Sequence, residues 1–527
     1  MTTQNAILKK VVDTYISQVD KNNVPAPEII EAKILEEITF EFQKENTNRQ
    51  SSSRLSIPKT LPNAAIASIL VELYYVRKIF WGDHRDNCDL AVYQSSGPDE
   101  GLYVVSDSLL VALISRFNYD ISAFNVKNIM ALLDANAPVC TLTEDPDLIP
   151  VNNGIFNYKT KELMSFSPDY VFVSKSNVNY NPDACNVIVH NSVDGSDWDV
   201  ETWIAELSDD SEVVKLIWQM IGAVIRPNVR WNKVLCLYSE RGNNGKGTLC
   251  ELLRGICGEG RHTSLSFSDF GHEFKLEALS HVSAVITDEN ATGFFSRATA
   301  ELKAVITNDK VLINRKYKNP IAIRFRGLMV QCINDLPKFS DKSESLYRRF
   351  LFVPFDKCFT GYERKYIKAD YLHRQDVLEY VLYKVLNTNF YAFDEPRASR
   401  LLLSDYKISN DPVRDFLDDI LPQCVWSIIP YAFLYDLYKS WFSYNCPSGQ
   451  PLGKRNFIHA VKNILIDDPE WSVREDACYV GKLMDAHEPL IYKYKLTSWM
   501  NPNYKGSDIK KICDFERKVS YRGILRK

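Results

Sequence analysis

Hydrophobic and polar positions follow several different patterns along this chain of 527 residues. Residues 5–43 and 61–81 carry apolar side chains at helical spacing, and the polar, serine-rich segment 44–59 between them is typical of a linker. From about residue 90 to 191, short alternating runs mix with helical ones, which predicts a small α+β domain. Residues 203–225 are strongly apolar at helical spacing and lead into a different pattern.

Four short apolar runs dominate the middle of the chain, at residues 234–238, 282–287, 327–333 and 350–355. Runs of this length are typical of buried strands, and they predict an α/β domain built on a sheet. In such a sheet, ligands bind in the crevice where the strands end. The polar residues that flank these runs are therefore the first candidates for chemistry.

The first run leads into a turn rich in glycine and asparagine, followed by a helical pattern at residues 249–256. Backbone N–H groups at such a helix start wrap phosphate oxygens, a lysine amine adds a cation, and a hydroxyl reaches Mg²⁺. The sequence departs from the usual G-x-x-x-x-G-K-[ST], because Glu240 replaces the first glycine and Gly247 moves the hydroxyl to Thr248. An ordinary strand–helix turn is the alternative. The candidate nucleotide-binding residues are Gly242, Asn243, Asn244, Gly245, Lys246, Gly247 and Thr248.

Two carboxylates and an amide follow the next two runs. Asp288 and Glu289 come directly after the second run, and Asn334 comes after the third. One carboxylate of such a pair holds the Mg²⁺ shell, and the next orients and deprotonates the attacking water. We therefore expect Asp288 as a metal ligand together with Thr248, Glu289 as the catalytic base, and Asn334 near the γ-phosphate or the water. Each feature alone also fits a solvated strand end or a turn.

This ordered set of motifs resembles the superfamily 3 helicases, the ring ATPases of small viruses, phages and plasmids. The resemblance is greatest to the poxvirus, phage and plasmid primase–helicase branch, over roughly residues 95–395. The shared features are Asn244 before Gly-Lys, the acidic pair, an Asn-Asp-x-Pro turn at 334–337 and Arg-Arg-Phe at 348–350. Three upstream segments resemble the domain that precedes the ATPase in that branch, at residues 150–158, 167–170 and 179–184.

The resemblance implies an α/β protein with a P-loop, AAA+-like ATPase core, in which residues 203–225 form an oligomerisation collar. A helix packed on its own domain is the alternative for that stretch. We expect Arg349, ahead of Arg348, to act on the neighbouring subunit as an arginine finger, because both directly precede a strand. The expected divisions are a helical extension and linker (1–60), an α+β domain (61–200), the superfamily 3 helicase ATPase domain with its collar (201–400), and a winged-helix-like domain with a basic tail (401–527).

Residues 310–326 carry six basic residues and no acidic one. Apolar positions alternate on both sides of residues 315–320, which predicts a hairpin with a basic, aromatic tip. In superfamily 3 helicases a hairpin at this place lines the central channel and grips one strand. The resemblance thus implies that Lys316 and Lys318 contact phosphates and that Tyr317 stacks on a base. A solvated hairpin is the alternative.

The last part of the chain has its own organisation. Residues 425–442 predict two short helices and residues 453–465 a further helix, and alternating runs at 471–474 and 489–496 predict two strands. Helices followed by a two-stranded ribbon predict a winged helix, one helix of which enters the major groove of DNA.

Lys454 and Arg455 lie on the polar side of the predicted helix at 453–465 and are candidate contacts to duplex DNA. The basic stretch 505–527 adds to this surface. A solvated tail and a docking site for a protein partner are the alternatives.

Together these features predict an ATP-dependent DNA helicase that uses Mg²⁺, forms a homohexameric ring and translocates on one DNA strand during replication of a phage, plasmid or other mobile element. Its expected partners are single-stranded and duplex DNA, other copies of itself, and a separate primase or loader protein. An ATP-switched origin-binding initiator without unwinding activity is one alternative, and a structural or packaging NTPase is another. A full primase is disfavoured, since no zinc cysteines and no obvious cluster of three metal-binding carboxylates precede the ATPase.

The composition of the chain adds only a few constraints to this predicted function. The net charge of −4 means that DNA contacts must come from local basic patches. The twelve cysteines include no C-x-x-C pair, which excludes the zinc-ribbon spacing and favours reduced thiols. No apolar run approaches the ~20 residues of a membrane span, and the start has no secretory signal pattern. We therefore expect a cytoplasmic protein of the host cell with no membrane partner.

Overall fold

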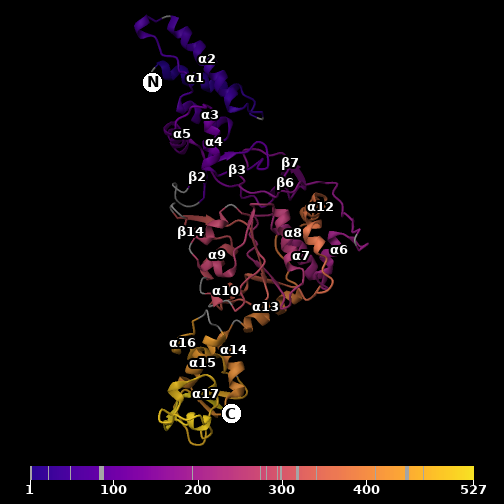
Figure 1. Ribbon diagram of the computed structural model, residues 1–527, viewed down its shortest axis with the longest axis vertical. Helices are drawn as coiled ribbons and strands as arrows, with labels where there is room; N and C mark the ends of the chain where they lie inside the picture. Colours follow the sequence, from indigo (N-terminus) through magenta and orange to yellow (C-terminus); the bar gives the residue numbers. More distant parts are fainter. Residues whose placement is uncertain are drawn as a thin grey trace.

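The computed structural model describes residues 3–21, 23–47, 49–81, 88–192, 194–272, 274–280, 282–293, 295–296, 299–315, 320–339, 341–409, 411–445, 450–466 and 468–527. In Figure 1, N-terminal helices occupy one end of the long axis, a sheet flanked by helices lies in the middle, and the C-terminal part lies at the other end. No helix in the described part of the chain combines the length and apolarity needed to cross a membrane.

The N-terminal part is mainly helical. Its helices are α1 (Thr3–Gln18), α2 (Pro27–Thr47), α3 (Asn63–Leu73), α4 (Asp107–Ser115) and α5 (Ala123–Asn136). On α2, side chains four residues apart from Ile30 to Phe42 are buried on one face, and they share a core with α1, α3, α4 and α5. The predicted linker folds back on α2, because the Asn46 side chain bonds to the backbone N–H and carbonyl of Leu55 at 2.7 and 2.9 Å.

Short strands connect these helices to the middle of the molecule. One sheet has the order β3-β2-β1-β4, and its strands are β1 (Arg77–Phe80), β2 (Cys88–Tyr93), β3 (Tyr103–Val104) and β4 (Val139–Cys140). A second sheet contains β5 (Leu148–Val151), β6 (Gly154–Asn157) and β7 (Glu162–Met164), and β8 (Val189–His190) pairs with β9 (Asp197–Trp198). The mixture of strands and helices predicted for residues 90–191 is confirmed. The helix predicted at 61–81 ends at Leu73, because the chain from Arg77 pairs with β2 instead.

The middle of the molecule is built on a parallel sheet of five strands in the order β11-β12-β16-β10-β18. Its strands are β10 (Val234–Tyr238), β11 (His262–Thr263), β12 (Ala284–Thr287), β16 (Leu328–Ile333) and β18 (Phe350–Pro354). All four predicted strands are confirmed. The strand β11 escaped prediction because it has only two residues and neither is strongly apolar. Among these five strands, β10 comes first in the chain, but in the sheet it lies between β16 and β18, the fourth and fifth in chain order.

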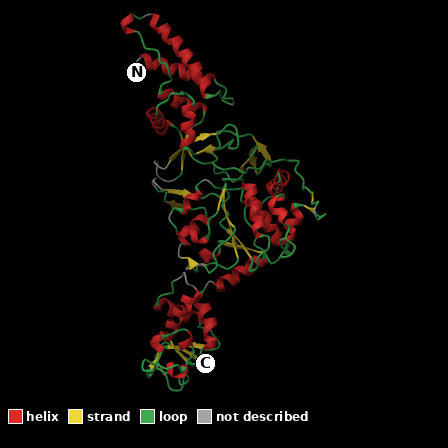
Figure 2. Ribbon diagram, viewed as in Figure 1, coloured by secondary structure: helices red, strands yellow, loops and turns green. Residues whose placement is uncertain are grey.

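Helices cover both faces of this sheet (Figure 2). Because successive side chains on a strand alternate in direction, Leu235 and Leu237 pack with α7 (Ser211–Ala223), α8 (Lys246–Cys257) and α12 (Gln375–Leu386). Val234 and Cys236 pack on the other side with α9 (Thr299–Ile306) and α13 (Arg397–Ser409). Smaller elements around the sheet are α6 (Val200–Glu206), β13 (Phe295–Ser296), β14 (Lys310–Ile313), β15 (Ile321–Arg324), β17 (Lys338–Phe339), α10 (Glu344–Tyr347) and α11 (Lys365–Ala369).

The C-terminal part has a core of its own. Its helices are α14 (Pro412–Ile420), α15 (Tyr431–Asn445), α16 (Lys454–Ile464), α17 (Leu490–Lys493) and α18 (Ile509–Ile512). Its strands are β19 (Ile428–Pro430), β20 (Trp471–Val473), β21 (Cys478–Tyr479), β22 (Ser520–Tyr521) and β23 (Gly523–Arg526). The antiparallel sheet has the order β19-β23-β20, and β21 pairs with β22.

Two expectations for the C-terminal part were wrong. Residues 425–442 contain strand β19 and most of one long helix, α15, in place of two short helices. Residues 489–496 form the short helix α17, which starts after Pro489, so the strand beside β20 is β23 from the end of the chain. The buried Glu488 carboxylate fixes this turn, since it accepts the backbone N–H groups of Val425 and Trp426. The predicted helix at 453–465 is confirmed as α16.

Candidate functional site

A buried lysine lies at the carboxyl ends of the two central strands. Lys246 is the first residue of α8, directly after the turn that follows β10, and only 6% of its surface is exposed. Its amine donates to the Asn334 side-chain oxygen at 2.6 Å and to the carbonyls of Ile333 and Ser239 at 3.2 and 3.3 Å. Asn334 comes just after β16, and the pairing of β10 with β16 brings the two residues together. The predicted meeting of these residues is therefore seen.

The Lys246 amine has no carboxylate partner among the residues that the structure describes. Burial lowers the pKa of this amine, because the charged form is deprived of water. The amine also stands at the start of a helix, where the dipole and free backbone N–H groups favour an anion. The Lys246 amine is therefore a buried cation whose charge a bound anion would neutralise.

The turn before Lys246 has a strained, closely packed backbone. Asn243 and Gly245 have φ angles of +54° and +87°. The buried Asn244 side chain donates to the Arg241 carbonyl at 2.5 Å and accepts the Lys246 N–H at 3.3 Å. A Cβ atom on Gly245 would lie 2.7 Å from Leu207 Cδ2. Both the backbone angle and the space at this position therefore require glycine.

Replacing Gly245 by alanine is expected to lower the free energy of unfolding by about 1–3 kcal/mol, because the side chain meets both the left-handed backbone and Leu207. Gly242→Ala is the matched control in the same turn, since nothing lies within 4 Å of the added Cβ. Its effect should stay within about 0.5 kcal/mol. Urea unfolding curves of the two variants measure the difference, and equal midpoints would contradict the assigned role of Gly245.

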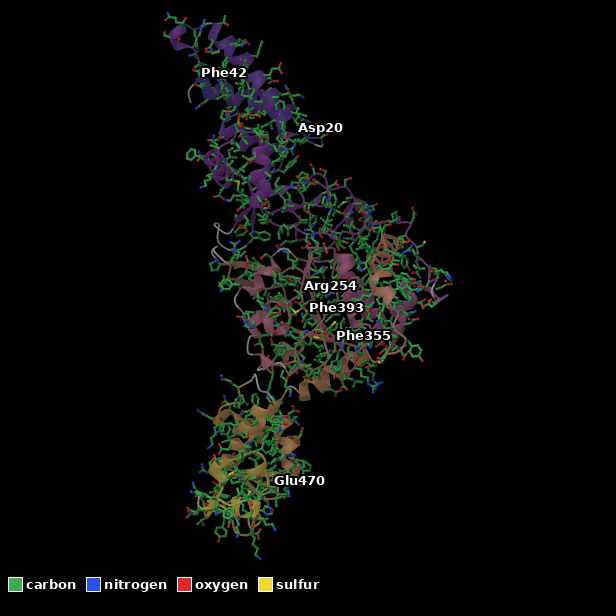
Figure 3. All side chains as sticks on the ribbon, in the orientation of Figure 1. Asp20, Phe42, Arg254, Phe355, Phe393 and Glu470 are labelled. Atoms are coloured by element: carbon green, nitrogen blue, oxygen red, sulfur yellow. The ribbon has the colours of Figure 1, made fainter. Side chains whose placement is uncertain are left out.

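The acidic pair lies at the same edge of the sheet, after β12. Asp288 accepts a hydrogen bond from Arg254 Nη2 at 2.7 Å, and Figure 3 labels Arg254 in the middle of the molecule. The ligand atoms of Asp288, Cys250 and Cys332 all lie within 4.8 Å of one another. Glu289 is exposed to solvent. Sequence reasoning missed Arg254 and Cys250, because only the packing of α8 on the sheet brings them to Asp288.

The residues expected to hold Mg²⁺ have different neighbours. Thr248 lines a cavity beside α11, whereas Asp288 is bound to Arg254. Mg²⁺ prefers oxygen ligands and takes one or two protein carboxylates together with substrate phosphates. Asp288 and Glu289 supply such oxygens, and they would fit Mg²⁺ once Asp288 exchanges Arg254 for the metal. The neighbouring thiols are softer ligands and do not suit this ion.

Arg348 and Arg349 lie at the opposite edge of the sheet. They precede β18, whose first residue, Phe350, pairs in parallel with Val234 at the start of β10. The Arg349 guanidinium donates to the Ser345 hydroxyl at 2.9 Å and also to the Ser345 carbonyl, whereas Arg348 is exposed. Neither arginine therefore joins Lys246 within the same chain.

The predicted hairpin is formed by β14 and β15 in antiparallel register, with Val311 opposite Ile323 and Ile313 opposite Ile321. These four apolar side chains are buried, as the alternating pattern predicted. Arg315, two residues after β14, lies 3.4 Å from the Asp89 carboxylate. The tip residues Lys316, Tyr317 and Lys318, which were predicted to contact DNA, lie outside the described residues.

Helix α16 presents a polar face to solvent. Lys454 and Arg455 in its first turn are exposed, as are His459 and Asn463 further along. The apolar side of the helix packs into the C-terminal core through Phe457 and Val461. The structure therefore leaves the predicted DNA-contact residues free of the protein core.

A cavity of about 290 Å³ adjoins the turn at Asn243–Thr248 and was not foreseen from the sequence. Its other walls come from α6 and from the segment after β18 that includes α11. No motif in the sequence links that segment to the turn. The contact depends on the chain returning past the turn after β18.

Three family descriptions match successive parts of the chain. Residues 67–231 match "D5 N terminal like", and residues 408–495 match "Poxvirus D5 protein-like". The two D5 matches thus flank the middle of the molecule on both sides. The chain belongs to the D5-like primase–helicase family. For this D5-like protein, membership indicates a replication enzyme that depends on nucleotide and binds DNA, with a helicase or primase role.

Residues 237–349, which contain Lys246, Asp288 and Asn334, match a family of unknown function (DUF5906). Among solved structures, the D5-like chain is similar to the NrS-1 C terminal region. One such structure shares 13% identity over 68% of this chain and 80% of that one, with a TM-score of 0.38. Another shares 12% identity over 80% of this chain and 98% of that one, with a TM-score of 0.41. The family assignment rests on the two D5 matches.

Proposed function

We propose that this protein is an ATP-dependent DNA helicase that acts in the replication of a phage, plasmid or other mobile element. The observation that carries the proposal is the buried Lys246 amine, held by the Asn334 side chain and by carbonyls at the start of α8. A triphosphate bound there would neutralise the amine and use the N–H groups of the turn. The position of β10 between β16 and β18 supports a P-loop, AAA+-like core.

Five candidate residues near the carboxyl ends of β10, β12 and β16 are each assigned a role in hydrolysis. Lys246 holds the β- and γ-phosphates, and Thr248 and Asp288 hold the Mg²⁺ shell. Glu289, which is exposed and next to Asp288, orients and deprotonates the attacking water. Asn334 contacts the γ-phosphate or the water, because it already accepts a bond from Lys246. Mg²⁺, when bound with ATP, neutralises charge on the phosphates.

The positions of Arg348 and Arg349 support a role for one of them at the nucleotide of the neighbouring subunit. Since Arg348 and Arg349 precede β18 while Lys246 follows β10, they lie at the edge of the sheet away from their own Lys246. In a ring of identical subunits, most simply a hexamer, that edge would face the nucleotide of the neighbour. Either guanidinium would then stabilise the charge that develops on the transferred phosphate.

The β14–β15 hairpin supports a grip on one DNA strand. Its two strands are fixed to the middle of the molecule by the buried apolar side chains Val311, Ile313, Ile321 and Ile323. Lys316 and Lys318 would contact phosphates, and Tyr317 would stack on a base. A separate primase or loader protein would complete the replication assembly.

The C-terminal part supports a winged-helix assignment. The elements α14, β19, α15, α16 and β20 come in this order in the chain, and β23 comes later, after β21, α17, α18 and β22. In the sheet, β23 lies between β19 and β20. Helix α16 is the last helix before β20, the first strand of the ribbon, which is the position of a helix that enters the major groove. Its exposed first turn, with Lys454 and Arg455, would meet the phosphates of duplex DNA.

The double variant Lys454→Ala/Arg455→Ala of the full chain is expected to bind duplex DNA more weakly and with a shallower salt dependence. Each lost phosphate contact reduces the slope of log affinity against log salt by about 0.9. Lys9→Ala/Lys10→Ala is the matched control, since these two residues are also exposed and adjacent on a helix. Fluorescence anisotropy at several salt concentrations measures both slopes. Equal slopes for the two variants would place duplex binding elsewhere.

Steady-state ATP hydrolysis by the full chain tests the proposed function. We expect hydrolysis that requires Mg²⁺, rises when single-stranded DNA is added, and is abolished by Lys246→Ala. Hydrolysis that ignores DNA would favour a structural or packaging NTPase. An origin-binding initiator, which the exposed basic turn of α16 also suits, would hydrolyse ATP without separating strands.

A further inference from the structure

Hydrogen bonds define the position of the cavity beside the turn at Asn243–Thr248. The Phe359 N–H donates to the Asn243 carbonyl at 2.7 Å, and the Asn243 side chain donates to Thr360 Oγ1 and Glu363 Oε1 at 3.2 Å each. These bonds tie the segment after β18 to the turn at Asn243–Thr248. The cavity of about 290 Å³ opens between them, so anything bound in it also touches the turn.

One wall of the cavity is apolar. Trp203 and Leu207, from α6 and its end, and Ile367 from α11 are buried and line it. The Phe359 ring, at 3.7 Å from the Cβ position of Gly245, lies where this wall meets the turn. Tyr362 stands at the rim with 84% of its surface exposed. Flat apolar surfaces with aromatic rings at their edge are suited to stacking with a planar ring.

A second cation reaches the start of α8 from this side. Lys368 Nζ lies 3.7 Å from the Cβ position of Gly247, the residue that replaces the usual serine or threonine. Within the described residues, the Lys368 amine has no ion pair, whereas nearby Arg364 is bound to Glu206. Glycine at position 247 leaves the space between this amine and the helix start open.

We propose that this cavity holds the base and ribose of the nucleotide, with the base against Phe359 and Tyr362, and that Lys368 contacts its phosphates beside Lys246. The inference rests on the proposed function, since it assumes that the triphosphate lies on the turn. It adds the residues that recognise the nucleoside, and it assigns Lys368 a role that the sequence motif does not contain.

Isothermal titration of the full chain with two probes separates the nucleoside from the phosphates: Mg-ADP, and inorganic tripolyphosphate with Mg²⁺. Tyr362→Ala and Phe359→Ala should each weaken Mg-ADP binding about tenfold, which is within the range for a base stacked on an aromatic side chain. Both variants should bind tripolyphosphate as the wild type does. Lys368→Ala should weaken the binding of both probes.

Tyr444→Ala is the matched control, because Tyr444 is also 84% exposed but lies on α15 in the C-terminal part. Tyr362 is so exposed that its replacement leaves the core intact, so its result stands even if Phe359→Ala folds poorly. Wild-type affinity of Tyr362→Ala and Lys368→Ala for Mg-ADP would overturn the assignment while leaving the phosphate site in place. A wild-type protein that binds neither probe would overturn the proposed function and the cavity assignment together.

Discussion

The Glu289→Gln protein is expected to bind Mg-ATP as tightly as the wild type and to hydrolyse it about 10²–10⁴ times more slowly. The amide keeps the size of the side chain but cannot take a proton from the attacking water. Glu289 is exposed and follows Asp288 at the end of β12, so its replacement leaves the core unchanged. Phosphate release measures turnover, and titration with a non-hydrolysable ATP analogue measures binding.

Glu301→Gln provides a control for that experiment, because Glu301 is also an exposed glutamate and lies on α9. It should hydrolyse ATP at the wild-type rate. Wild-type turnover by Glu289→Gln would show that another group activates the water, and the acidic pair would then have to be reassigned.

Replacing Arg349 by alanine is expected to lower turnover by about 10³–10⁵-fold if the guanidinium acts as an arginine finger. Because Arg349 precedes β18, away from Lys246 of its own chain, the partner of this residue would be the next subunit. Mixing Arg349→Ala with Lys246→Ala subunits should therefore restore part of the activity. Each mixed ring then contains interfaces with an intact lysine facing an intact arginine.

The turnover of Arg348→Ala should be measured beside that of Arg349→Ala. Arg349 is held by Ser345, whereas Arg348 is exposed, so Arg349 must leave Ser345 before it can reach a neighbour. A larger loss for Arg348→Ala would assign the finger to Arg348. Mixed rings that assemble without any recovery of activity would mean that the arginine acts within its own subunit or only in folding.

Strands buried on both faces were the easiest elements to predict. Val234–Tyr238 and Leu328–Ile333 are continuous apolar runs because helices cover both sides of the sheet. Residues 489–496 misled for a related reason: Leu490 and Ile491 are both buried, and a short apolar stretch does not reveal whether a strand or a turn of helix buries it. The partner of β20 came from the chain end, far away in the sequence.

The site was partly predictable for topological reasons. Lys246 and Asn334 each follow a parallel strand, and neighbouring parallel strands end at the same edge, so their meeting could be expected. The bond between Arg254 and Asp288 could not, because it depends on how α8 packs against β12. The same holds for Lys368, whose approach to Gly247 depends on the path of the chain after β18.

The separation of a forked DNA duplex by the full chain tests the central claim most directly. With Mg²⁺ and ATP, the wild type should release the labelled strand over time, and the Lys246→Ala protein should release none. ATP hydrolysis by the wild type without any strand release would contradict the helicase assignment and favour an initiator that uses ATP only as a switch.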